Sequence, residues 1–125
     1  MANPNIVNVT TILGVTTYLT PANTTANTLL SNASGSGLVY KINQIVCANV
    51  NGASAVNATV AINNAAAGAG TDFPVISTIS VPASASVIAV DKTTAIYLME
   101  NSSIVVTSGT SSGITYTLSY ESIAA

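Results

Sequence analysis

The chain has 125 residues, of which 49% are hydrophobic but only 5% are aromatic and 5% are charged. Soluble domains usually carry about 25% charged residues, so Ser, Thr, Asn and Ala must form most of this surface. The chain has no Arg, no His and two Lys, which excludes a basic patch for nucleic acid, His-based catalytic triads and His-based zinc sites.

A chain of this length predicts one domain covering residues 1–125. Residues 1–9 contain Pro4 and three Asn with little apolar periodicity, so we expect an extended N-terminal arm outside the core. No apolar run reaches the roughly 18 residues of a membrane span. Met1 is not followed by a basic and then apolar signal segment. We therefore expect a protein that is made and used in a cytoplasm or leaves the cell by lysis, without a membrane partner.

The first half of the chain contains three predicted strands. Thr10–Leu19 is rich in Thr, Val, Ile and Tyr, and Thr24–Leu30 is a weaker strand candidate that ends in a loop over Ser31–Gly37. The clearest alternation covers Leu38–Val50. Its apolar residues change parity partway along, which predicts a bulge or burial on both faces.

Turn signals suggest how the next segments are connected. Asn51 and Gly52 form the strongest short hairpin signal in the chain, and alternation resumes over Val56–Asn63. This pattern predicts that Leu38–Val50 and Val56–Asn63 pair antiparallel. The small residues of Ala65–Gly70 then predict an exposed loop.

The second half predicts several more short strands. Phe73–Val81, Ser86–Val90 and Ala95–Met99 precede a predicted hairpin of Ser103–Thr107 with Ile114–Glu121. About eight or nine short strands with turn signals about every 8–12 residues indicate an all-β fold. The expected architecture is a two-sheet antiparallel β-sandwich of the jelly-roll or immunoglobulin-like kind, and a small barrel is the alternative.

The carboxylates are too few to suggest catalysis. Asp91 and Glu100 flank one strand segment, where a glycosidase pair is conceivable, but we favour solvated turn residues. Asp72 follows the Gly-containing loop, whereas calcium sites cluster several carboxylates in one loop. We therefore expect no catalytic residue, no metal site and no cofactor, and hence no enzyme.

Three other residue types have structural interpretations. Cys47 lies in the apolar run Ile45–Ala48 and is expected to be a buried, unreactive side chain. Lys41 is expected to protect a strand edge from mispairing. Tyr116 and Tyr120 share parity with apolar residues, so we expect packed rings with hydroxyls at the rim in preference to a carbohydrate platform.

Parts of the sequence resemble a known class of proteins. The stretch Asp91–Ile104, the closing run Leu118–Ile123, the opening Thr10–Gly14 and the strand Lys41–Asn43 resemble small virion structural proteins of tailed bacteriophages, especially those infecting cyanobacteria. The resemblance implies a β-sandwich built into a phage particle. It implies either a capsid decoration (cement) protein or a component of the tail, neck or fibre, and it brings no catalytic residues.

These observations lead to one expectation and one alternative. We expect a non-enzymatic virion protein, assembled in the host cytoplasm, that forms homo-oligomers, with trimers favoured. It would stabilise the head by binding the major capsid protein, or other virion proteins, through edge-strand and arm contacts. The alternative is a carbohydrate-binding, adhesin-like module.

Overall fold

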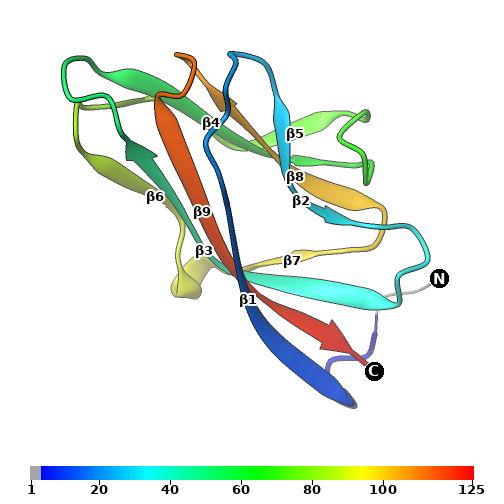
Figure 1. The fold of residues 1–125 in the computed structure, drawn as a ribbon. Helices are drawn as coiled ribbons and strands as arrows, with labels where there is room; N and C mark the ends of the chain where they lie inside the picture. Colours follow the sequence, from blue (N-terminus) through cyan, green and yellow to red (C-terminus); the bar gives the residue numbers. More distant parts are fainter. Residues whose placement is uncertain (1–3) are drawn as a thin grey trace.

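The computed structural model describes residues 4–125, which form nine antiparallel strands in two packed sheets (Figure 1). This confirms the predicted all-β sandwich. Sheet A has five strands: β1 (Thr11–Leu19), β3 (Leu38–Asn49), β6 (Ser86–Val90), β7 (Ile96–Leu98) and β9 (Ile114–Ala124). Sheet B has four strands: β2 (Asn27–Asn32), β4 (Val56–Asn63), β5 (Asp72–Val81) and β8 (Ser102–Ser108). A single 3-10 turn, η1 (Lys92–Thr94), precedes β7.

The strand order distinguishes between the two expected sandwich types. Sheet A runs β1-β9-β3-β6 with β7 beside β3, and sheet B runs β2-β8-β4-β5. If the short β7 is set aside, the first and last strands lie side by side, and strands that follow one another mostly alternate between sheets. This is the order of a jelly roll, whose two Greek keys give two four-stranded sheets.

The predicted hairpin at Asn51-Gly52 is wrong. β3 lies in sheet A and pairs with β9, β6 and β7, whereas β4 lies in sheet B and pairs with β5 and β8. A two-residue hairpin of this sequence needs positive φ at both central residues, and neither Asn51 nor Gly52 has it. Instead, Asn51 Oδ1 accepts hydrogen bonds from the amides of Ala53 and Ser54, and the loop crosses between the sheets.

The predicted terminal hairpin is wrong for the same topological reason. β8 pairs with β2 and β4, while β9 pairs with β1 and β3. β9 alternates because one face packs against the opposite sheet, whereas β8 is a continuous buried run from Ser103 to Val106. Both patterns identified strands correctly, but neither could assign the two strands to different sheets.

Tyr116 connects these two strands across the core. Its side chain is fully buried, and its hydroxyl donates to Thr107 O at 2.5 Å and accepts from the Thr59 amide at 3.3 Å. The hydroxyl therefore lies between the sheets, not at the rim as expected. Burial raises the pKa of Tyr116 above its ordinary value. Tyr120 is only partly buried, and its ring packs on Tyr40 with centroids 4.8 Å apart.

The change of parity in β3 corresponds to a bulge. The register with β9 shifts between Ile42 and Gln44, so Ile42 faces the core before the bulge and Ile45 and Cys47 face it afterwards. This confirms the predicted irregularity. Lys41 lies before the bulge in a central strand, 4.0 Å from Glu121 of β9, so the expectation that it protects an edge is wrong.

The loop after β4 covers part of sheet B. It was expected to be an exposed tip, but Ser103 Oγ and Ser31 Oγ donate to the carbonyls of Ala65 and Ala66. These bonds hold the loop on the outer face, where Val105 is buried. Gly68 has a φ of 76°, and a Cβ there would lie 3.3 Å from Val105 Cγ1, so this position favours glycine.

Buried Asn side chains form hydrogen bonds with backbone groups at three of the connections between strands. Asn32, Asn49 and Asn63 are the last residues of β2, β3 and β4, and all three are buried. β2 extends to Asn32, beyond its predicted end, and this side chain donates to the carbonyls of Leu38 and Leu98. A neutral amide can satisfy several backbone groups of a crossing loop without burying a charge.

We predict that Asn49→Ala lowers the free energy of unfolding by about 2–4 kcal/mol. Asn49 Nδ2 donates to the carbonyls of Ser54, Val81 and Pro82, and its Oδ1 accepts from the Asn51 amide. Urea denaturation measures the loss. The matched control is Asn57→Ala at an exposed position of β4, where we expect a change within about 0.5 kcal/mol. Equal effects at the two positions would contradict the assigned role of Asn49.

Candidate functional site

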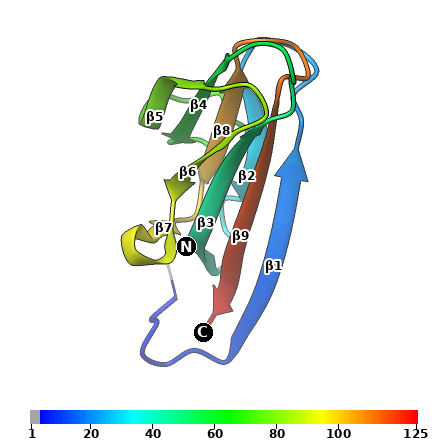
Figure 2. The same ribbon diagram turned by 90° about the vertical axis from the view of Figure 1, so that its left-hand side faces the viewer.

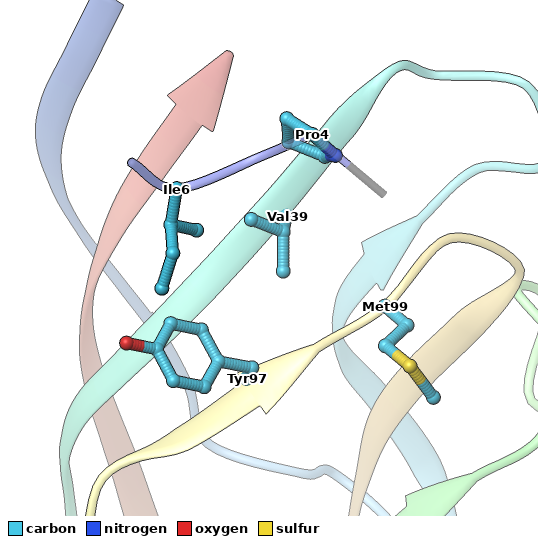
Figure 3. Close-up of a pocket in the computed structure, with 5 residues that line it drawn as sticks. All are labelled: Pro4, Ile6, Val39, Tyr97 and Met99. Carbon is cyan, nitrogen blue, oxygen red and sulfur yellow. The ribbon is translucent and has the colours of Figure 1, made fainter. Parts of the chain in front are cut away.

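An apolar groove lies on the outer face of sheet A, at the end where β1 begins and β9 ends. It has a volume of about 290 Å³ and is lined by Pro4, Ile6, Val39, Tyr97 and Met99 (Figure 3). Figure 3 shows Pro4 and Ile6 on the N-terminal segment above β3, and Tyr97 and Met99 along β7 and its extension. We call these five residues the arm groove.

The N-terminal segment forms one side of this groove. The Asn8 amide donates to Asn5 O at 3.1 Å, and the Val7 amide donates to Asn5 Oδ1 at 3.0 Å, so the segment makes a turn. It is then fixed to the end of β9 by the Thr10 amide, which donates to Ala124 O at 2.8 Å. The expected extended arm covered residues 1–9: positions 1–3 lie outside the described residues, and from Pro4 onward the segment folds back against its own sheet.

Burial in the groove is uneven. Val39 is on the outer face of β3 but is only 3% exposed, and Ile123, its register partner in β9, is also buried. Ile6, Tyr97 and Met99 remain about half exposed. The groove therefore has a buried floor and exposed apolar walls, an arrangement suited to an apolar side chain from another molecule.

The structure gives each carboxylate a local structural partner. Asp91 caps η1 and accepts from the amides of Thr93 and Thr94, and its bonds with Thr93 lower the pKa of this exposed carboxyl. Glu100 Oε1 accepts from the Gly37 amide at 2.6 Å. Asp72 Oδ1 accepts from Asn63 Nδ2 at 2.6 Å. The candidate pair Asp91 and Glu100 thus lies at opposite ends of the segment containing η1 and β7, with each residue bound to nearby backbone.

Residues 4–125 contain no group of three or more acidic, Cys or His side chains placed to share a metal ion. Within these residues, no helix has the length and apolar character needed to cross a bilayer.

The exposed tyrosines do not form one aromatic platform. Tyr18 of β1 is 74% exposed and Tyr97 of β7 is 46% exposed. Across the sheet, Tyr97 of β7 lies level with Gly14 of β1, because Lys41 of β3 and Glu121 of β9 connect them in register. Tyr18 is four residues further along β1, or about 13 Å at the usual rise of a strand. The two rings are too far apart to stack on one sugar.

Cys47 is the one thiol of the chain, and its position agrees with the expected buried residue. Its side chain is fully buried in the core between the sheets. Burial raises the pKa of this thiol to about 12. At neutral pH it is therefore protonated and unsuited to act as a nucleophile.

Comparison with known proteins gives no relative from which a role could be transferred. No protein-family model matches the chain. No curated protein matches it either.

We predict that Cys47 makes stability fall in alkaline solution. The pKa of the thiol rises from 9.0 to about 12 on folding, so the unfolded chain releases this proton first as the pH rises. The contribution of the protonated thiol to the free energy of unfolding is fully present below pH 9 and is lost between pH 9 and 12. Between pH 8 and 10 the unfolding free energy of the wild type should fall by about 1–2 kcal/mol more than that of Cys47→Ala. Urea titrations at the two pH values measure this difference, and parallel curves would contradict it.

Proposed function

We propose that this protein is a non-enzymatic structural component of a phage particle, most specifically a decoration protein of the capsid. In this role it assembles with copies of itself and binds the major capsid protein. A component of the tail, neck or fibre is the closest variant of the same proposal. It acts through surface contacts and needs no cofactor.

The arm groove is the observation that carries this proposal. Apolar walls formed by Ile6, Tyr97 and Met99 stay about half exposed next to a buried floor. A soluble monomer seldom keeps such a surface beside so little charge, because net charge keeps proteins apart in solution. The surface is suited to remaining covered in an assembly.

The fold and the side-chain chemistry support the same proposal. Jelly rolls serve as viral capsid domains and as lectin domains, although a fold alone does not determine a function. The resemblance to phage virion proteins favours the first of these uses. The four carboxylates have local structural partners and the thiol is buried, so the side chains best suited to catalysis are occupied in structural roles.

Within the particle, we place the arm groove against the capsid protein. An apolar groove about 290 Å³ in volume can accept one or two apolar side chains of a neighbouring subunit. Because Pro4 and Ile6 form one wall, the N-terminal segment takes part in the contact even though it is folded back.

We predict that Ile6→Asn combined with Met99→Asn weakens binding to capsids about tenfold or more. Each change removes a half-exposed apolar side chain from the groove. Sedimentation of the labelled protein with expanded capsids assembled from the major capsid protein measures the binding. The matched control is Val50→Asn combined with Ile88→Asn, since these residues have similar exposure but lie outside the groove. Binding by the control should equal that of the wild type.

Two results would count against the proposal. Equal capsid binding by both double variants would remove the arm groove from the contact. Saturable binding on a glycan array, together with no uptake by capsids, would favour the adhesin-like module instead.

A further inference from the structure

The two sheets have four edges, and three of them are protected against pairing with another chain. β5 contains Pro74 and two breaks in its register with β4, and Thr78 within it has a φ of 47°. β2 has six residues and a register break between Thr28 and Leu30. The other edge of sheet A is formed by β6, which has five residues and a break in its register with β3, and by β7, which has three residues. Proline, irregular register and short length are the usual means of protecting an edge.

The fourth edge, β1, has none of these features. It has nine residues, contains no proline and no charged residue, and pairs with β9 without a break from Thr11↔Ala124 to Leu19↔Tyr116. Figure 2 shows β1 at the border of sheet A, and no strand within residues 4–125 pairs with its other side. In a regular antiparallel pair, alternate residues of an edge strand point their amides and carbonyls away from the partner. β1 therefore presents a straight row of backbone donors and acceptors.

Apolar side chains accompany this row on both faces of the sheet. Val15 pairs with Tyr120, which pairs in turn with the core residue Ile42, so Val15 is on the inner face of the sheet. Because side chains alternate along a strand, Leu13 is also on the inner face, and Ile12 and Tyr18 are on the outer face. All four are exposed, between 38% for Val15 and 74% for Tyr18. Addition of a strand beside β1 would cover apolar surface and satisfy backbone groups in the same step.

We propose that β1 pairs antiparallel with β1 of a second copy of this chain about a two-fold axis, joining the two A sheets into one continuous sheet. This inference rests on the proposed function in assuming self-assembly, and it specifies the contact. An isologous contact of this kind closes with two copies, in place of the three that the sequence favours.

The sequence of β1 is suited to pairing with itself. With the axis at Val15, Ile12 of one copy lies opposite Tyr18 of the other, since these residues are three positions before and after Val15. Leu13 then lies opposite Thr17 on the inner face, and Val15 lies opposite its own copy. Pairs of aromatic with β-branched residues stabilise neighbouring strands.

Charge also favours a second copy as the occupant. β1 has no charged side chain to attract a partner of opposite sign. Glu121 of β9, which is paired with Gly14 of β1, lies 4.0 Å from Lys41 of β3, so these two charges offset one another. Two copies can therefore approach along β1 without repulsion between like charges, which is the usual obstacle to self-pairing.

The test compares two double variants by analytical ultracentrifugation. Ile12→Lys with Tyr18→Lys places lysines opposite one another in the proposed contact and should raise the dimer dissociation constant at least about 100-fold. The matched control, Ile88→Lys with Phe73→Lys, changes an Ile and an aromatic residue of similar exposure on β6 and β5 and should leave the dimer intact. A wild type that is monomeric or trimeric, or a β1 variant that remains dimeric, would overturn the inference.

Disulfide trapping gives an independent measurement. Val15→Cys should form a cross-link between two copies under mild oxidation, because this residue meets its own copy at the axis, whereas Cys47 is buried and stays reduced. Ile88→Cys should give no such cross-link, and equal cross-linking at both positions would overturn the inference.

Capsid binding of the wild type separates this inference from the proposed function. Capsid uptake by a protein without the β1 dimer would contradict the inference and leave the function standing. A β1 dimer that capsids do not take up would support the inference and contradict the proposed function.

Discussion

The need to satisfy buried backbone groups without charge governs this fold. A jelly roll sends its chain repeatedly from one sheet to the other, and each crossing brings carbonyls and amides close to the core. Asn32 and Asn49, at the ends of β2 and β3, bind those groups where the chain crosses. Asn63 binds the loop that joins β4 to β5 within sheet B. An ionised carboxylate would need a compensating cation, which a chain with two Lys can seldom supply. The topology and the unusual composition are therefore connected.

The chain also covers much of its own outer surface. The loop after β4 lies over Val105 on sheet B, and the N-terminal segment lies over Val39 on sheet A. Among the apolar surfaces that remain uncovered are the walls of the arm groove and the edge at β1, while other exposed residues such as Val50, Phe73 and Ile88 lie elsewhere. These two surfaces differ in kind, since the groove offers apolar side chains and the edge offers backbone hydrogen bonds. They are thus suited to two different contacts in one assembly.

Most strands were predictable from the sequence because apolar and polar residues alternate in a strand that packs on one face. Ile114–Tyr120 shows this alternation, and in β3 the bulge left a visible change of parity. The pairing of strands was not predictable, because alternation says that a strand is half buried but not in which sheet it lies. Asn51-Gly52 shows the difficulty, since the same two residues suit a tight hairpin and a longer crossing loop. The arm groove was missed because the segment containing Pro4 and Ile6 has no periodicity and acquires its role only by folding onto β3 and β7.

The pair of Lys41 and Glu121 has a consequence for the environments that the protein tolerates. Dissolved ions weaken attraction and repulsion between exposed charges, whereas salts such as sulfate strengthen the burial of apolar surface. With this pair at 4.0 Å and few other ionised side chains, the fold offers little charge for ions to screen. Screening should therefore cost it little stability in dilute and in concentrated salt alike.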